Sequence, residues 1–243
     1  MSQKTHKATR AIIMAAGIGK RLQPLTFKTP KPLIKVHGVS MINTAIEALH
    51  KNGIAEIHIV VGHLKEQFNA LMTEYEGIDL IENPYYDTCN NISSLYVARE
   101  YLGDCIILDG DQVITNSEIL DPCFERSGYN AVWTDVPTKE WLLTVEDGIV
   151  RSCSTNGGSG GWQLYSISRW SKEDGIKLQK HIEIEFEVKK NRQIYWDNVA
   201  LLCYPQEYTL GIKEMKREDV TEIDGLDELI AYDESYKDML EGA

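Results

Sequence analysis

The chain has 243 residues, with 37 acidic and 25 basic side chains and a net charge of −12. A chain of this length can bury a hydrophobic core without disulfides, and 43% apolar with 26% charged residues is typical of a globular protein. The acidic balance argues against a nucleic acid or an anionic membrane as the main partner.

The N-terminal region faintly resembles a signal peptide, because basic residues precede the apolar run 11–16. Two glycines and the pair Lys20-Arg21 follow at once, which favours a buried strand instead. No segment approaches the roughly 18 apolar residues of a membrane span. The five cysteines are scattered without metal-ligand spacing, so we expect reduced thiols and a cytoplasmic protein.

The first half of the chain alternates short apolar runs with segments of helical spacing. Residues 1–9 are polar and are expected to form a flexible N-terminus, whereas residues 10–243 are expected to form a single domain. We expect strands at 11–15, 57–61, 78–81 and 105–108, and helices at 41–52, 64–75 and 93–101. This alternation predicts an α/β fold with helices on both faces of a mixed, mostly parallel sheet.

The second half has a different pattern and no linker before it. We expect strands at 129–136, 141–145, 162–167 and 208–212, and helices at 171–190 and 224–240. A glycine-rich loop at 156–161 precedes the third of these strands. We interpret this half as an elaboration that covers the carboxyl edge of the sheet.

A glycine turn follows the first expected strand, in the run Ala15-Ala16-Gly17-Ile18-Gly19-Lys20-Arg21. Open α/β sheets bind ligands at this edge, and glycine lets backbone N–H groups approach an anion closely. Arg21 offers a forked contact to phosphate, and Lys31 offers a point charge between two prolines. The turn matches neither the Walker loop nor the dinucleotide fingerprint, because Arg21 and Leu22 stand where those motifs require other residues.

Two aspartates, Asp109 and Asp111, follow the expected strand 105–108 and should lie at the same edge. A carboxylate repels polyphosphate unless a divalent cation lies between them. Mg²⁺ takes one or two protein carboxylates and completes its shell with phosphate oxygens and water. We therefore expect a second carboxylate from a distant segment.

The glycine turn, together with Pro24, Thr26, Pro30 and Lys31, resembles the signature of nucleotidyltransferases that join an NTP to a sugar phosphate or alcohol phosphate. The resemblance implies a three-layer αβα, Rossmann-like nucleotidyltransferase fold and Mg²⁺ as cofactor. It also implies site residues: catalytic Arg21 and Lys31, metal-binding Asp111 and Asp224, and nucleotide-binding Ala15, Ala16, Gly17 and Gly19, with Asp109 as a supporting partner on the nucleotide side.

Further segments resemble one branch of that family, the bacterial choline-phosphate cytidylyltransferases: Asn83-Pro84-Tyr85-Tyr86, Asn90-Asn91, Glu140-Trp141 and Tyr195-Trp196-Asp197-Asn198. This branch implies CTP and phosphocholine as the substrates. The Asn90-Asn91 segment, with Ser93, is expected to contact the cytosine. A quaternary ammonium favours aromatic faces and a nearby carboxylate, so the expected choline site is made of Trp141, Tyr195, Trp196 and Asp197.

Three alternatives remain open. The acceptor could be an aminoalkylphosphonate such as 2-aminoethylphosphonate, whose primary ammonium favours carboxylates and carbonyls over aromatic rings. A sugar-1-phosphate would need polar hydroxyl partners that the aromatic segments do not offer. A nucleotide-binding module without catalysis would not need Arg21, Lys31, Asp111 and Asp224 together.

Overall fold

The computed structural model describes residues 5–237, and a nine-stranded sheet runs through the molecule in the order β10-β14-β12-β11-β13-β7-β2-β5-β6. The strands are β2 (Arg10–Ala15), β5 (Glu56–Val61), β6 (Ile78–Glu82), β7 (Cys105–Asp109), β10 (Gly128–Thr134), β11 (Leu142–Glu146), β12 (Ile149–Ser154), β13 (Gly161–Trp170) and β14 (Gly211–Glu214). All but β12 were expected from the sequence, although β14 was expected at 208–212 and begins three residues later. Strand β12 carries polar residues and is largely exposed, so it has no apolar run to reveal it.

The sheet is mixed, as expected, but parallel pairing does not predominate, since four strand pairs are parallel and five are antiparallel. The parallel pairs lie mainly in the first half of the chain. Strands β6, β5, β2 and β7 pair in parallel, and β13 then joins β7 in antiparallel orientation. In the second half only β10 and β14 are parallel. Because β10 also pairs with β13, the strands β10, β14, β12, β11 and β13 close on themselves as a small barrel.

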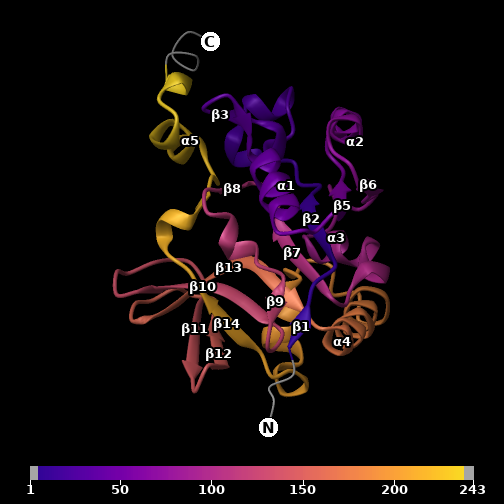
Figure 1. Cartoon of the computed structure of the whole chain (residues 1–243), viewed down its shortest axis with the longest axis vertical. Helices are drawn as coiled ribbons and strands as arrows, with labels where there is room; N and C mark the ends of the chain where they lie inside the picture. The colour runs from indigo at the N-terminus through magenta and orange to yellow at the C-terminus, as the bar shows by residue number, and fades with distance from the viewer. Residues whose placement is uncertain (1–4, 238–243) are drawn as a thin grey trace.

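The helices cover both faces of the parallel strands, which confirms the three-layer arrangement (Figure 1). Alternate residues of β2 point to opposite faces. Ala11 and Ile13 belong to the core that contains α1 and α2, whereas Ile12 and Met14 belong to the core that contains α3 and α4. The helices are α1 (Met41–Lys51), α2 (Asn69–Glu74), α3 (Ile92–Val97), α4 (Lys172–Glu183) and α5 (Leu226–Tyr232).

Four of the expected helices are shorter than the sequence suggests. In the expected helices 64–75 and 93–101, residues Lys65–Phe68 and Arg99–Tyr101 form 3-10 turns, so α2 and α3 have six residues each. Helix α4 gives way to a π-helical turn, Ile184–Val188, so α-helix does not continue to residue 190. Helix α5 ends at Tyr232 because Asp233 adopts an extended backbone conformation. The carboxylate of Asp233 accepts a hydrogen bond from the backbone N–H of His37 at 2.7 Å. The remainder of the expected 224–240 helix, from residue 238, lies outside the described residues.

The flexible N-terminus expected for residues 1–9 stays a prediction, but residues 6 and 7 have a regular partner. They form β1 (His6–Lys7), which pairs with β9 (Cys123–Phe124). Residues 1–4 lie outside the described part of the chain. Over residues 5–237, none of the helices is long and apolar enough to cross a membrane.

Two short ribbons complete the fold: β3 (Lys35–Val36) with β4 (Val39–Ser40), and β8 (Gln112–Ile114) with β15 (Val220–Glu222). In the second ribbon Gln112 lies opposite Glu222. The residue before β8 therefore lies beside the residues that follow β15. This pairing brings the carboxyl end of β7 together with a segment near the C-terminus.

Candidate active site

Two adjoining cavities open at the carboxyl edge of the parallel strands, and both are lined by Gly17, Arg21, Asp111 and Asp224. The first, of about 260 Å³, is also lined by Gly19 and Lys31, and we call it the loop cavity. The second, of about 380 Å³, extends over Asn90, Trp141, Tyr195 and Asp197, and we call it the acidic cavity.

The glycine turn shapes the loop cavity. Gly19 has φ +67°, and a Cβ there would lie 3.1 Å from Cβ of Lys31 and 2.9 Å from Cγ2 of Thr26. Only glycine adopts this conformation easily in so little space. Around Gly17, in contrast, no atom of the described residues lies within 4 Å of the place that a Cβ would take. Its backbone therefore borders free space in both cavities, where a ligand can approach.

Both predicted cations form ion pairs with the predicted metal carboxylates. The Lys31 ammonium donates to Asp111 Oδ2 and, at 3.0 Å, to Asp224 Oδ1. The Arg21 guanidinium donates to the same Asp224 oxygen at 2.8 Å. Only 11% of the Lys31 side chain is exposed, compared with 70% of Arg21. Lys31 is therefore a fixed, buried charge, whereas Arg21 is free to move toward a ligand.

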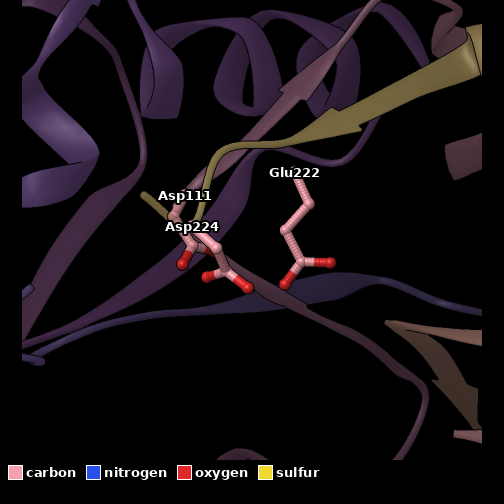
Figure 2. A group of neighbouring side chains, drawn as sticks. All are labelled: Asp111, Glu222 and Asp224. Atoms are coloured by element: carbon pink, nitrogen blue, oxygen red, sulfur yellow. The ribbon is translucent and has the colours of Figure 1, made fainter. Parts of the chain in front are cut away.

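Three carboxylates from the two strands of the β8–β15 ribbon converge beside these cations. One oxygen each of Asp111, Glu222 and Asp224 lies within 4.8 Å of the others, and Figure 2 shows the three groups turned toward one another. The backbone N–H groups of Asp224 and Gly225 donate to Glu228 Oε2 at 2.5 and 3.0 Å, which fixes the start of α5.

The cluster has the donor chemistry of a divalent-metal site. Carboxylate oxygens are the ligands that Mg²⁺ prefers in proteins. Within residues 5–237, the buried Oδ1 of Asp111 has no hydrogen-bond partner, so it is available to a metal ion. Burial, with repulsion from Asp111 and Asp224, raises the pKa of Glu222 to about 8. A cation bound here would relieve that repulsion.

The electrostatics of the cluster explain the state of Lys31. Burial alone would lower its pKa, but the carboxylates of Asp111 and Asp224 outweigh this effect and hold the pKa above its ordinary value. Lys31 is thus charged throughout the neutral range. Burial and the neighbouring Asp111 also raise the pKa of the Asp109 carboxyl group, well above the usual range, and for an acid this favours the neutral form.

The acidic cavity carries far more negative than positive charge. Its lining acids are Asp109, Asp111, Glu140, Asp197, Glu222 and Asp224. Among the described residues that line it, Arg21 is the only lysine or arginine. Raised pKa values favour the neutral forms of Asp109 and Glu222 at neutral pH, so the negative charge of this cavity comes mainly from the other acids. This charge favours a ligand that brings positive charge, as a metal ion, an ammonium group or both.

Two aromatic rings and a buried carboxylate also line the acidic cavity. The rings of Trp141 and Tyr195 meet edge-on with centroids 5.8 Å apart, and Tyr195 is 50% exposed. Asp197 is only 4% exposed, and its Oδ1 has no hydrogen-bond partner within the described chain. Burial raises the pKa of Asp197 to about 7, and the neighbouring Tyr129 hydroxyl only partly offsets this. The Asp197 carboxylate is therefore poised to accept from a positively charged donor.

Most residues that the sequence singled out do border the two cavities: Ala15, Ala16, Gly17, Gly19, Arg21, Lys31, Asn90, Asp109, Asp111, Trp141, Tyr195, Asp197 and Asp224. The roles assigned to them stay predictions.

Two expected site residues do not reach the cavities. Trp196 is fully buried and packs against Tyr129 and Trp170, with ring centroids 5.9 and 6.1 Å apart. It is a core residue and offers no face to a ligand. Ser93 is also buried, and its hydroxyl donates to the backbone oxygen of Asn90 at 2.8 Å. Ser93 supports the Asn90 loop from behind, while its neighbour Ser94 lines the acidic cavity.

The sequence-based assignment missed Glu222 and Glu140. Glu222 ends β15, and Asp224 follows two residues later, so an extended chain turns both side chains to one side. That spacing was a usable signal. Glu140 precedes Trp141 and lines the same cavity, but its surroundings depend on strands that are distant in sequence.

The chain belongs to the nucleotidyl transferase family, whose model matches residues 10–140. It is 38% identical to 2-aminoethylphosphonate cytidylyltransferase of Lancefieldella rimae, over 96% of this chain and 95% of that protein. It is 32% identical to choline-phosphate cytidylyltransferase of Streptococcus pneumoniae, over 94% of this chain and 98% of the relative.

A solved structure agrees with this assignment. The CTP:phosphocholine cytidylyltransferase structure from Streptococcus pneumoniae superposes with a TM-score of 0.85 and 31% identity, over 93% of this chain and 98% of the other. The nucleotidyltransferase fold expected from the sequence is thereby confirmed, and the chain is a nucleotidyltransferase.

Proposed function

We propose that this nucleotidyltransferase transfers CMP from CTP to a small phosphonate or phosphate that carries an ammonium group, releasing pyrophosphate. The observation that carries the proposal is the acidic cavity, which is lined both by the Asp111–Glu222–Asp224 cluster and by the buried carboxylate of Asp197. A positive charge on the acceptor would offset part of the negative charge of this cavity.

In the proposed reaction, an acceptor oxygen attacks the α-phosphorus of CTP. A new P–O bond forms there, and the bond to the β-phosphate oxygen breaks. A phosphate monoester is largely dianionic at pH 7, because its second pKa is near 6, so the attacking oxygen needs no general base. Consistent with this, no histidine or cysteine appears among the described residues that line the two cavities.

The chain's own groups act by position and charge. Gly17 leaves room for the triphosphate, and Lys31 offers a buried positive charge at the reacting phosphate. Arg21 can leave Asp224 and contact phosphate oxygens, because its side chain is largely exposed. Mg²⁺, held by Asp111, Glu222 and Asp224, would supply further neutralisation of the charge shared by the two anions.

We favour the primary ammonium of 2-aminoethylphosphonate as the acceptor's positive group. A primary ammonium donates hydrogen bonds, and the unpartnered Oδ1 of Asp197 can accept one. The buried position of Trp196 removes one of the three rings expected around a trimethylammonium group. The 38% identity to a 2-aminoethylphosphonate cytidylyltransferase over most of both chains supports the same choice.

Phosphocholine is the second candidate, and one observation favours it. Trp141 and Tyr195 line the acidic cavity as an aromatic pair, and cation–π contacts are worth roughly 0.5–2 kcal/mol each. The relative at 32% identity is a choline-phosphate cytidylyltransferase. The sequence-based expectation of phosphocholine therefore stands beside the phosphonate as an alternative.

The test is pyrophosphate release over a matrix of four NTPs against 2-aminoethylphosphonate, phosphocholine, phosphoethanolamine and glucose-1-phosphate. We expect CTP with 2-aminoethylphosphonate to give the highest kcat/KM. A tenfold preference for phosphocholine would reverse the order of the two candidates. Activity restricted to glucose-1-phosphate, or to another NTP, would overturn the proposal.

Asp197→Asn tests the contact to the ammonium group. The carboxylate is charged above its pKa of about 7 and neutral below it. We therefore expect kcat/KM for 2-aminoethylphosphonate to rise in the wild type between pH 6 and 8. In Asp197→Asn this value should fall at least about tenfold at pH 8, and the rise should flatten, because a lost charged hydrogen bond costs about 1.5–3 kcal/mol.

One control variant and one stability measurement accompany Asp197→Asn. As the control, the exposed Asp87→Asn should keep the wild-type pH profile. Protein stability gives a second readout. Burial raises the pKa of Asp197 to about 7 in the folded state. Between about pH 4 and 7 the group is ionised in the unfolded chain but protonated in the folded protein, so the free energy of unfolding falls as the pH rises. The thermal midpoint of Asp197→Asn should decline less over this range than that of the wild type. An unchanged acceptor KM at pH 8 would remove Asp197 from the acceptor site.

Arg21→Ala tests the mobile cation. The wild-type ion pair with Asp224 is exposed, and such pairs contribute little to stability, so the melting temperature should barely change. We expect KM for CTP to rise about 3- to 30-fold through lost phosphate contacts. Steady-state kinetics with CTP varied at saturating acceptor would measure this. A change below threefold in kcat/KM would mean that Arg21 is only a surface residue.

A further inference from the structure

The glycine-rich segment 156–161, which the proposed chemistry does not use, lies directly against the segment that carries Glu140 and Trp141. Thr138 N–H donates to Gly158 O at 2.8 Å, and Gly158 N–H donates back to Thr138 O at 2.9 Å. Gly160 N–H donates to Thr134 O at 2.9 Å. Residues 135–141 and 155–160, which we call the flap, are thus joined backbone to backbone.

The contact is closest at Gly157. A Cβ there would lie 2.1 Å from the carbonyl oxygen of Thr138 and 2.8 Å from Cα of Lys139. Since nonbonded carbon atoms rest about 3.5 Å apart, a side chain at this position would displace the main chain by about 1 Å. Gly160 has nearly the same φ, +69° against +70°, yet a Cβ there would meet nothing within 4 Å. An alanine would therefore strain the backbone at both positions, but only at Gly157 would its Cβ also clash with the main chain.

The backbone that Gly157 touches leads directly into the wall of the acidic cavity. Glu140 N–H donates to Thr138 Oγ1 at 3.1 Å, so Thr138 also orients the start of that wall. Trp141 is tied on its far side, where its carbonyl oxygen accepts from Leu164 N–H at 2.9 Å. Glu140 and Trp141, the flap wall, are consequently fixed between Thr138 and β13.

We propose that the glycine segment is a positioning element: through Gly157 and Thr138 it sets the place of the flap wall and thereby the acceptor specificity of the enzyme. The inference rests on the proposed function, because it takes the part of the acidic cavity that Glu140 and Trp141 line as the acceptor site. The wall offers a ring and a carboxylate to the ammonium tail. A shift of about 1 Å there changes how that tail fits while the triphosphate loop stays in place.

Gly157→Ala with Gly160→Ala as its matched control tests the proposal. Pyrophosphate release is measured with 2-aminoethylphosphonate and with phosphocholine, and CTP is titrated separately at saturating acceptor. In Gly157→Ala we expect kcat/KM for the better acceptor to fall at least about fivefold and discrimination between the acceptors to narrow. KM for CTP should stay within about twofold. Gly160→Ala should leave all three values within about twofold.

Thr138→Val provides a second variant in case Gly157→Ala folds poorly. It removes the hydroxyl that accepts from Glu140 N–H and keeps the size of the side chain. It should raise the acceptor KM without changing KM for CTP. Equal effects of the two glycine variants, or loss of CTP and acceptor affinity together, would overturn the inference alone. A wild-type enzyme that uses neither acceptor would overturn the proposed function, and this inference with it.

Discussion

Replacing Asp111 by asparagine is expected to lower kcat at least about 100-fold at saturating Mg²⁺, a loss of about 2.7 kcal/mol of transition-state stabilisation. Asp111 is the member of the carboxylate cluster with a buried oxygen that has no hydrogen-bond partner among the described residues. Its amide analogue keeps the shape but loses the charge that attracts a divalent cation. We therefore expect the fold to survive while metal-dependent turnover is lost.

The measurement is pyrophosphate release against Mg²⁺ concentration, with thermal unfolding to monitor the fold. Asp227→Asn is the matched control. Asp227 belongs to the same C-terminal segment as Glu222 and Asp224, but it is exposed and lines neither cavity. It should retain wild-type activity. Chelator should abolish turnover in the wild type. If Asp111→Asn is fully active in Mg²⁺, Asp111 has no part in the metal site.

Lys31→Met is expected to lower kcat by about 10²–10³-fold, the range found when a charge-stabilising donor is removed from an active site. The side chain is buried and is held by two carboxylates beside the glycine turn, so its charge acts without reorganisation. The loss of kcat in Lys31→Met should exceed that in Arg21→Ala, because the Lys31 side chain is buried and the Arg21 side chain is largely exposed.

Stability gives a readout of Lys31 that is independent of turnover. Without its charge, three carboxylates within 4.8 Å of one another would repel with no buried cation between them. The variant should therefore melt at a lower temperature in chelator than the wild type, and added Mg²⁺ should stabilise it more. The exposed Lys28→Met should behave as wild type in both assays. Equal Mg²⁺ stabilisation of wild type and Lys31→Met would contradict this account of the cluster.

The sequence by itself determined the features that depend on local chain structure. A buried strand that runs into glycines must deliver its turn to the carboxyl edge, so the position of Gly17 and Gly19 followed from pattern alone. Asp111 was found for the same reason, because it comes directly after a buried strand. The alternation of apolar runs and helical spacing likewise predicted helices on both faces of the sheet.

The tertiary structure decided which neighbouring side chains face the cavity. Tyr195 and Trp196 are adjacent and both aromatic, yet Tyr195 is half exposed at the acidic cavity and Trp196 is fully buried. Nothing local distinguishes them, because the difference comes from packing against Tyr129 and Trp170 on other strands. In the same way, Glu222 lies beside Asp111 in the carboxylate cluster because β15 pairs with β8. Which distant segments pair as strands depends on the packing of the whole core, and the periodicity of a short segment does not specify its partner.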